Sequence, residues 1–530
     1  MEEFFWAEKA VEEIVKIPKK LYVCEGMWTP SGFFHIGNAR PEIFTPYSVF
    51  VTLEDKGFKA KQNFIIDDFD AVRKIPSGLG VKQEDEANFL GFPCAVAPSP
   101  VAGFKSWADF FVSDVRANIK EFGVPLNILS AFQTYKDGLF NDLVRFSLDH
   151  SKEIVTVWNR VSGSSKQADF IPVQVVCSSC KKLYFTEAVS WDGKKVGFKC
   201  SSCGTEGEVS PFDGNAKLHW RVHWVCHWLV HDVAFESGGK DHFSKGGSVE
   251  VGRALIKEVF RKDPPVQFPT EFIQLKGAKM SGSVGNVINL GQWLEVASPD
   301  LFRFMNLSTR PQRVLEFALD DNSFFLLDEK FLRAERVFFG LEKAENEKIE
   351  RQLKRSYALS LLSKPSKKIP PRVPLQFAVF LSQLIDPQKD FQKLLSVLEN
   401  TGHLPEKISA PEKEALQKRF VRAKAWAQRY GGPAYRFGFL ESLGEEVLSS
   451  IKPEVKSVFP ALAKKISSSK NADEAQTAVF VVSKGSGFPA KELFRAIYLV
   501  LLGKESGPKV GSLVFALGKD KVVKRFLEVK

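Results

Sequence analysis

The segment TPSGFFHIGN at residues 29–38 constrains the fold more than any other stretch of this chain. It follows a short apolar run and precedes a helical pattern, so we expect a strand at 21–27 and a helix at 42–56. A second apolar run at 61–67 ends in carboxylates. This β-α-β order predicts a parallel sheet whose ligands bind at the carboxyl ends of its strands.

The turn between the first strand and the helix has the features of a phosphate site. A helix N-terminus carries unpaired backbone N–H groups, which favour an anion. Gly32 and Gly37 would allow the backbone to approach a ligand closely. His35 and Asn38 would add side-chain donors for phosphoryl oxygens.

A second candidate loop, KMSGS at residues 279–283, follows the apolar run at 271–275. Lys279 offers a mobile cation for a triphosphate, while serine and glycine keep the loop pliable. Either segment alone could be an ordinary surface turn. The two together, in this order, favour a site for a nucleoside triphosphate.

These two segments resemble the ATP-binding signatures of class I aminoacyl-tRNA synthetases, and their variants resemble those of class I lysyl-tRNA synthetases. Further matches to that family extend over nearly the whole chain. They are DDFDAVRKIP at 67–76, WRV at 220–222, GKDH at 239–242, Trp426 with Tyr430, YRF at 435–437 and LLGKESGP at 501–508. The combination is specific, whereas no single motif would be.

The resemblance implies a Rossmann-like α/β catalytic domain at 1–290, with an insertion at about 76–212. A helical connecting domain at 291–363 and an all-α anticodon-binding domain at 374–530 would follow. It also implies an ATP-dependent, AMP-forming lysine–tRNA ligase. The lysine carboxylate would attack the α-phosphorus of ATP to give lysyl-adenylate, and the lysyl group would then pass to the terminal adenosine of tRNA(Lys).

The resemblance also assigns roles within the two loops. The implied ATP-binding residues are Thr29, Pro30, Ser31, Gly32, His35, Gly37, Asn38, Lys279, Met280 and Ser281. His35 and Asn38 would contact the phosphates, with Mg²⁺ accompanying ATP. Lys279 would stabilise the charge that develops on pyrophosphate, helped by Ser281 and Ser283. Because no protein nucleophile is needed, catalysis would rest on positioning and charge stabilisation.

The carboxylates Asp67, Asp68 and Asp70 would suit a cationic substrate at the end of the second strand. We predict that Asp68 or Asp70 contacts it, although a helix N-cap with solvated charge remains open. The resemblance implies four further residues that line or border the amino-acid pocket: Gly26, Thr29, Trp220 and His242. Core packing for the tryptophan and helix capping for the histidine are the alternatives.

Four cysteines form two C-x₂-C pairs, Cys177 with Cys180 and Cys200 with Cys203, separated by 19 residues. This spacing is typical of zinc sites, and four thiolates make a closed tetrahedral Zn²⁺ site that is structural. Aromatic and β-prone residues between the pairs predict a small zinc ribbon at 173–210. Free thiols in a loop or a redox dithiol are the alternatives.

Four histidines, His219, His223, His227 and His231, recur every four positions and would lie along one helix face. Both a second metal site and an exposed or packed face remain open. The family implies an aspartate where this chain has His223.

A different departure from the family lies at residues 99–110. In many relatives the matching stretch carries Asp, Cys and His residues that form a metal site. Here the implied ligand positions hold Ser99, Gly103, Phe104 and Phe110, and Cys94 nearby cannot make a site alone. We therefore expect that metal site to be absent.

The charge of the chain is uneven. Residues 401–530 contain 23 Lys and Arg against 13 Asp and Glu, whereas the net charge of the whole chain is +11. A basic module beside a nearly neutral one suggests that a polyanion docks at the C-terminal end. We expect Trp426, Arg429 and Arg436 to bind tRNA, because unstacked bases pair with aromatic and guanidinium planes. Solubilising charge and buried aromatics are the alternatives.

The remaining features concern compartment and assembly. No run of about 18 apolar residues appears, and the acidic N-terminal stretch does not read as a secretory signal. Seven cysteines in such a chain argue against a disulfide framework. We expect a cytoplasmic monomer that does not associate with membranes.

Three other functions remain open. A class I synthetase for another amino acid, such as glutamate, would share the architecture, although pocket carboxylates suit lysine better. A non-catalytic tRNA-binding relative is suggested by the departures at His223 and Ala234, whereas the two intact ATP segments argue against it. A different nucleotidylyltransferase would share the ATP segments but would not need the basic C-terminal part.

Overall fold

The computed structural model describes residues 5–275, 277–280, 287–405 and 407–530. None of the helices in these ranges combines the length and the apolar character that crossing a membrane requires. The chain forms two compact units. Unit 1 comprises residues 1–293, 299–318 and 343–364, and unit 2 comprises residues 294–298, 319–342 and 365–530.

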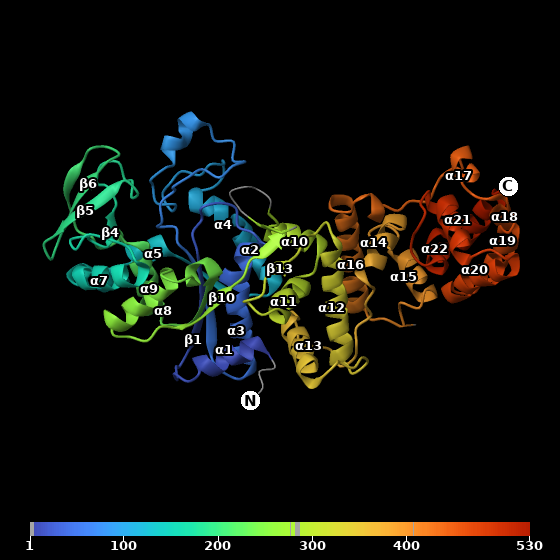
Figure 1. Ribbon diagram of the computed structural model, residues 1–530, viewed down its shortest axis with the longest axis horizontal. Helices are drawn as coiled ribbons and strands as arrows, with labels where there is room; N and C mark the ends of the chain where they lie inside the picture. Colours follow the sequence, from blue (N-terminus) through green and yellow to red (C-terminus); the bar gives the residue numbers. More distant parts are fainter. Residues whose placement is uncertain (1–4, 276, 281–286, 406) are drawn as a thin grey trace. The chain divides into compact units, whose positions relative to one another are not determined.

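A parallel sheet forms the centre of unit 1 (Figure 1). In the described residues its five strands are ordered β10-β9-β1-β2-β3. They span Val266–Thr270, Val233–Gly239, Tyr22–Trp28, Ala60–Ile66 and Leu126–Ser130 respectively. All neighbouring strands run parallel, and β1 pairs with β2 in register from Tyr22 opposite Ala60 to Trp28 opposite Ile66. The predicted parallel sheet is therefore confirmed.

The segment after β1 is not one continuous helix. The sequence predicts a helix at 42–56, but the structure has α2 at Ile36–Ala39, the π-helix η1 at Arg40–Phe44 and α3 at Thr45–Asp55. Pro41 and Pro46 lack backbone N–H donors, so a regular ladder of hydrogen bonds cannot run through both positions. Helical backbone therefore begins at Ile36, within the TPSGFFHIGN segment at residues 29–38, which we call the phosphate turn.

Unit 1 contains further helices and small strands besides this sheet. The helices are α1 Trp6–Ile14, α4 Trp107–Asn118, α5 Ala131–Lys136, α6 Asn141–Asp149, α7 Ser151–Ser162, α8 Trp220–His231, α9 Ser248–Glu258, α11 Pro299–Ser308 and α13 Glu347–Ser360, with 3-10 turns at Gln83–Asn88, Ile119–Phe122 and Lys240–Phe243. The small strands are β4 Val173–Val175, β5 Thr186–Trp191, β6 Val196–Cys200, β7 Glu206–Val209, β8 Ala216–Leu218, β11 Ile273–Leu275, β12 Ala278–Lys279 and β13 Leu315–Glu316. Helix α10, Leu290–Val296, contributes to both units.

Unit 2 is built from helices in the part of the chain that the structure describes. They are α12 Asn322–Phe338, α14 Leu375–Leu384, α15 Phe391–Asn400, α16 Ala410–Arg429, α17 Glu445–Ser449, α18 Pro453–Lys456, α19 Phe459–Ser468, α20 Ala472–Ser486, α21 Ala490–Leu502, α22 Val510–Leu517 and α23 Lys519–Leu527, with a 3-10 turn at Pro433–Tyr435. The helical reading of residues 374–530 agrees with this.

The guanidinium of Arg40 joins separate segments of unit 1. Arg40 is 1% exposed, and its terminal nitrogens donate to backbone carbonyls of Glu271 at 3.0 Å, Arg310 at 3.1 Å and Arg313 at 2.8 Å. Burial lowers its pKa to about 10, so the group remains charged at neutral pH. The side chain thereby connects the helix after the first loop to the segments that flank β11 and β13.

We expect Arg40→Ala to reduce the stability of unit 1 by about 3 kcal/mol or more, because several buried carbonyls would lose their donors. The midpoint of urea unfolding, followed by circular dichroism, measures this loss. Arg116→Ala is the matched control, because Arg116 is half-exposed and pairs with Asp109 at the surface. It should cost less than about 1 kcal/mol. Equal midpoints for the two variants would contradict the anchoring role.

Candidate active site

The first loop segment is contacted at the carboxyl end of β1 by residues from the second region. The Ile36 N–H donates to the Ile288 carbonyl at 2.9 Å, across more than 250 residues of chain. A Cβ added to Gly37 would lie 3.8 Å from the Cβ of Met280. The structure therefore brings Ile36 and Gly37 beside Ile288 and Met280. Ser281 and Ser283 lie outside the described residues. For Lys279 the structure describes the backbone, which belongs to β12.

The phosphate turn is internally ordered. His35 is buried and caps α2, because its Nδ1 accepts from the Gly37 N–H at 3.1 Å. This bond fixes the imidazole tautomer with the proton on Nε2. Asn38 is half-buried in the first turn, while Ser31 is exposed. The carbonyl of Pro30 accepts a hydrogen bond from the Trp107 indole N–H at 2.8 Å, which fixes the backbone of the turn at this residue.

Gly26 has a packing role that the resemblance does not indicate. A Cβ at this position would lie 2.0 Å from the carbonyl oxygen of Glu42. The absence of a side chain thus permits η1 to pack directly on β1. Its neighbour Thr29 is half-buried at the start of the turn.

An internal cation occupies the carboxylate cluster after β2. Lys217 Nζ lies 2.8 Å from both carboxylate oxygens of Asp67 and 3.3 Å from Asp70 Oδ1. Lys217 and Asp67 are each 1% exposed. Burial lowers the pKa of Lys217, but the two carboxylates raise it more, so the ammonium stays charged. Sequence analysis did not identify Lys217 as a site residue. The sequence feature that could have indicated its burial is its position between two apolar residues in Ala216–Leu218.

The carboxylate of Asp68 is engaged by neighbours as well. It accepts from the Ser130 hydroxyl at 2.6 Å and from the Phe132 N–H at 2.8 Å. Burial raises the pKa of Asp68 to about 6. The two carboxylate oxygens of Asp68 thus link the end of β2 to β3 and α5. Contact of Asp68 or Asp70 with substrate stays a prediction.

Trp220 and His242 do come together, although 22 residues separate them. Their ring centroids are 5.5 Å apart, and both are half-buried. Trp220 stacks on Trp224 at 4.8 Å, and the indole N–H of Trp224 donates to Glu236 at 2.8 Å. Trp228 donates to the same carboxylate at 2.6 Å. Burial raises the pKa of Glu236 to about 7. The two indole hydrogen bonds let this carboxylate hold the aromatic wall, which we define as Trp220, Trp224 and His242. Sequence analysis did not single out Glu236.

The four paired cysteines converge at one end of the small antiparallel sheet β5-β6-β7. The Sγ atoms of Cys177 and Cys203 are 3.6 Å apart, and those of Cys180 and Cys200 are 3.7 Å apart. All four lie within 4.8 Å of one another. A tetrahedral Zn²⁺ with Zn–S bonds of 2.3 Å separates its sulfurs by about 3.8 Å. The four thiols therefore fit the predicted metal.

The histidine series is packed against the sheet rather than exposed. His223 is fully buried, and its Nδ1 lies 3.0 Å from the Tyr135 hydroxyl. Burial holds the pKa of His223 well below its usual range, so the ring is neutral. His227 Nδ1 lies 2.8 Å from Glu25 Oε1, and the His231 ring stacks on that of His227 with centroids 4.5 Å apart. His219 packs edge-on against Trp158.

Aromatic side chains occupy the region in which the family resemblance implies ligands of a further metal site. The rings of Phe104 and Phe110 are 5.2 Å apart, and Phe33 lies 6.0 Å from Phe110. Gly103 adopts a positive φ of 94° in the preceding turn. The Ser99 hydroxyl bonds to the backbone of Val101. This region is therefore held by ring packing and local turns.

The prediction that Trp426 binds tRNA is wrong. Trp426 is fully buried, and its indole N–H donates to the Leu319 carbonyl at 2.6 Å. It packs on Phe324 and Phe325, because the helical period of α16 turns it toward the core of unit 2. Arg429 and Arg436 are exposed, and Arg429 pairs with Glu295.

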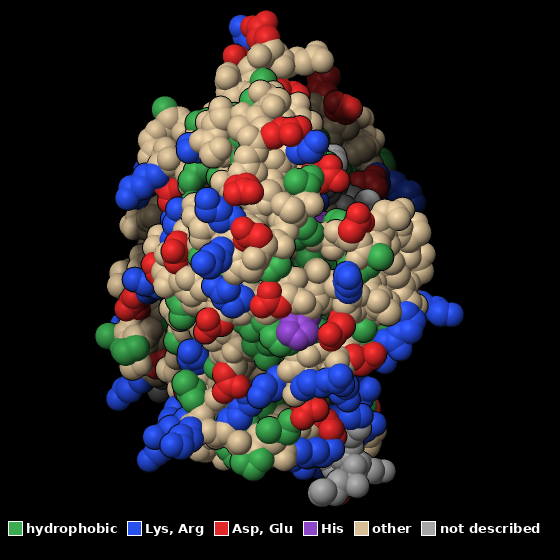
Figure 2. Space-filling view, turned by 90° about the vertical axis from the view of Figure 1, so that its left-hand side faces the viewer, with side chains coloured by type: hydrophobic (Ala, Val, Ile, Leu, Met, Phe, Trp, Pro, Cys, Tyr) green, Lys and Arg blue, Asp and Glu red, His purple; other side chains and the backbone are tan. Residues whose placement is uncertain are grey.

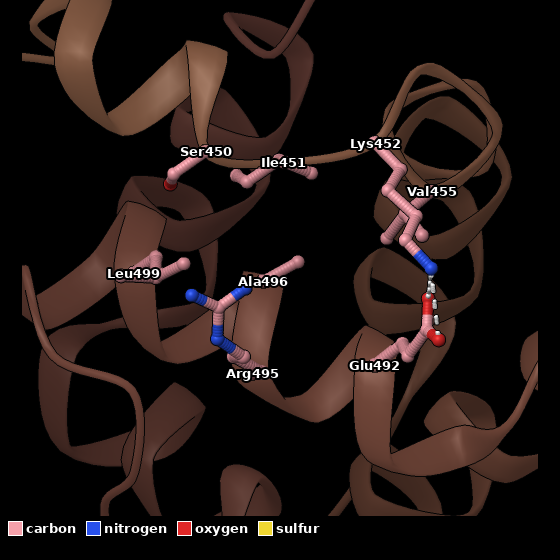
Figure 3. Close-up of a pocket in the computed structure, with 8 residues that line it drawn as sticks. All are labelled: Ser450, Ile451, Lys452, Val455, Glu492, Arg495, Ala496 and Leu499. Atoms are coloured by element: carbon pink, nitrogen blue, oxygen red, sulfur yellow. Dashed lines mark hydrogen bonds and ion pairs between the residues drawn. The ribbon is translucent and has the colours of Figure 1, made fainter.

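Unit 2 also contains a cavity of about 210 Å³ between α18, α21 and the segment joining α17 to α18 (Figure 3). Its lining combines the guanidinium of Arg495 with the apolar side chains of Val455 and Leu499. Lys452 and Glu492 form an ion pair at 3.1 Å on its rim. Figure 2 shows the side of the molecule that faces left in Figure 1, where Lys and Arg side chains are interspersed with Asp and Glu.

Known proteins match this chain over its whole length. Residues 4–363 match the family described as tRNA synthetases class I (K), and residues 439–529 match an anticodon binding domain. The chain belongs to the class I (K) tRNA synthetases. Lysine–tRNA ligases of Thermococcus kodakarensis, Pyrococcus furiosus and Methanocaldococcus jannaschii are 34%, 33% and 31% identical to it. Each comparison covers 98% of this chain and 98–99% of the relative.

We expect Lys217→Met to lower stability by about 3–5 kcal/mol, because it leaves the Asp67 carboxylate buried and unpaired. Urea unfolding measures the change. Adding Asp67→Asn to the variant should restore part of the loss, whereas a cavity effect would not be rescued. Lys199→Met, which removes an exposed partner of Glu206, is the control and should cost under about 1 kcal/mol.

Proposed function

We propose that this synthetase joins lysine to ATP, releases pyrophosphate and transfers the lysyl group to tRNA(Lys). The observation that carries the choice of amino acid is its full-length likeness to relatives named lysine–tRNA ligase. The Ile36–Ile288 bond supports the ATP chemistry, because it holds the first segment against the stretch of chain that follows the second one.

In the proposed reaction the protein positions groups and stabilises charge. The first-turn N–H groups of Ile36, Gly37 and Asn38 already have partners within the chain, so we assign the phosphate contacts to side chains. His35 donates from Nε2, since its Nδ1 is already an acceptor, and Asn38 donates from its amide. Lys279, aided by Ser281 and Ser283, neutralises the departing pyrophosphate, and Mg²⁺ accompanies ATP.

The aromatic wall is the proposed amino-acid site. Trp220 and His242 form one side of it, and Gly26 on β1 and Thr29 just after that strand border it. An indole face attracts an ammonium group, which suits the side chain of lysine. The buried Glu236 holds the neighbouring Trp224 in place.

We also propose that Cys177, Cys180, Cys200 and Cys203 hold a structural Zn²⁺, which makes the β5-β6-β7 sheet a zinc ribbon. The sulfur separations support this, and so do the two tight turns at Lys181 and Gly204, where φ is positive. Four thiolates leave no open position for water, so the ion would stabilise the ribbon without taking part in the reaction.

The C-terminal helices are the proposed anticodon-binding part, within residues 374–530. The anticodon-domain match at 439–529 and the excess of Lys and Arg over Asp and Glu in residues 401–530 support it. Arg429 and Arg436 are exposed candidates for tRNA contacts. Because charged tRNA is consumed in translation, we propose a cytoplasmic site of action. A monomeric state stays a prediction.

Amino-acid-dependent ATP–pyrophosphate exchange tests the function. We expect exchange with lysine and not with glutamate or the other amino acids. Lys279→Ala should reduce the exchange rate by about two to three orders of magnitude, the scale seen when a charge-stabilising group is lost. The matched control is Lys262→Ala, which removes an exposed lysine of the same unit. Exchange with glutamate alone would overturn the substrate, and a fully active Lys279→Ala would overturn the role of the lysine.

Cys200→Ser should bind one Zn²⁺ per chain fewer and unfold at a lower temperature, because metal binding at a structural site is coupled to folding. Metal content and thermal unfolding of the purified protein provide the readout. Cys24→Ser is the control, since Cys24 is a buried cysteine of β1 outside the ribbon. A Cys200→Ser protein that keeps its Zn²⁺ and its unfolding temperature would contradict the zinc ribbon.

A further inference from the structure

We propose that Glu25, His227 and His231 form a second Zn²⁺ site, which connects β1 to α8. These three residues offer one carboxylate oxygen and two imidazole nitrogens that all lie within 4.8 Å of one another. One carboxylate with two histidines is a ligand set that Zn²⁺ uses in proteins. The site is separate from the four cysteines and from the two ATP segments.

The spacing of the ligand atoms fits a small tetrahedral ion. His227 Nδ1 lies 2.8 Å from Glu25 Oε1, and His231 Nδ1 lies 3.9 Å from Glu25 Oε2. Ligands bound to Zn²⁺ at 2.0–2.1 Å are separated by about 3.3 Å in a tetrahedron. The two observed distances lie on either side of that value, and all three ligand atoms lie within 4.8 Å of one another.

Burial makes the polar atoms of this cluster costly without a partner. Glu25 is fully buried, and His227 is 1% exposed. Within the described part of the chain, the Nε2 atoms of both histidines find no hydrogen-bond partner, and Glu25 Oε1 is contacted by His227 Nδ1 at 2.8 Å. Buried polar groups are normally satisfied, and an ion would give the carboxylate and one nitrogen of each ring a partner.

The carboxylate is oriented by a ladder of side chains across three strands. Asn63 on β2 stands opposite Glu25 and donates to its Oε2 at 3.0 Å. Asn127 on β3 stands opposite Asn63 and donates to its amide oxygen at 3.1 Å. Outer groups of this kind hold metal ligands in position. The ladder occupies Oε2 and leaves Oε1 directed at His227.

The cluster lies on the opposite face of β1 from the phosphate turn. Adjacent residues of a strand point to opposite faces, and Gly26 faces Glu42 of η1. Glu25 therefore points to α8, on which His227 and His231 are four residues apart and share one face. A bound ion would brace the strand that leads into the ATP site without contacting substrate.

A buried ion pair between Glu25 and a protonated His227 is the competing interpretation. It accounts for the 2.8 Å contact but does not use the His231 ring, whose Nδ1 lies 3.9 Å from Glu25 Oε2. His223 lies outside this cluster, and its Nδ1 is engaged by Tyr135. The metal accounts for all three ligand residues together.

Zinc content of the purified, EDTA-washed and zinc-reloaded chain tests the site. We expect His231→Gln and Glu25→Gln each to bind one Zn²⁺ per chain fewer than the unaltered protein. His150→Gln is the matched control, because His150 lies at the junction of α6 and α7 and bonds to the Phe146 carbonyl. It should keep the full zinc content. Circular dichroism checks that each variant is folded.

Cobalt identifies which site is lost. When Co²⁺ replaces Zn²⁺, thiolate ligands give sulfur-to-metal charge-transfer absorption, whereas carboxylate and imidazole ligands do not. The difference spectrum between the unaltered protein and His231→Gln should therefore show visible cobalt bands without the thiolate absorption. Folded variants with unchanged zinc content, or a difference spectrum that carries the thiolate bands, would overturn the proposal. If His231→Gln does not fold, Glu25→Gln provides the same comparison, because a glutamine oxygen can still accept from Asn63.

Discussion

The buried guanidinium of Arg40 has to satisfy its donors inside the protein, and it does so on backbone carbonyls from segments far apart in the sequence. Its partners at Glu271, Arg310 and Arg313 flank β11 and β13, close to the second loop. Because a planar guanidinium places its N–H groups in fixed directions, these segments can approach in few ways. The contact between the Ile36 N–H and the Ile288 carbonyl, and with it the whole candidate ATP site, depends on that arrangement.

Buried charge is the common feature of the surrounding site. Lys217 is enclosed by Asp67 and Asp70, and Glu236 accepts from two indoles. In a low dielectric each such group is tolerated only when its partners are in place, so these networks favour one arrangement of the sheet ends. The strand ends are consequently rigid where substrate positioning needs rigidity. Asp67 and Asp70, which the sequence predicts to suit a cationic substrate, pair with the internal cation of Lys217.

Local patterns predicted much of this protein because their physical basis is local. Buried strands of a parallel sheet carry apolar stretches, which is why the apolar residues within 21–27 and 61–67 indicated β1 and β2. The C-x₂-C pairs bring cysteines together by short turns, so their convergence was predictable from spacing. The single helix expected at 42–56 was wrong in detail, because Pro41 and Pro46 interrupt the backbone ladder and introduce a π-turn. The prediction that Trp426 binds tRNA was also wrong, because the sequence around a tryptophan in a basic helix is the same whether its side chain faces RNA or the core.

By itself the sequence determined the parallel α/β architecture, the two loops with their glycines and charged side chains, the cysteine pairs and the family resemblance. Only the tertiary structure decided which charges neutralise each other, that Glu25 on β1 meets His227 on α8, and that Lys217 rather than solvent faces Asp67. The physical reason is that short-range patterns follow from backbone geometry and burial, whereas pairings between distant side chains depend on how separate elements pack. Those pairings are set by the packing of the whole unit and leave no periodic trace in the chain.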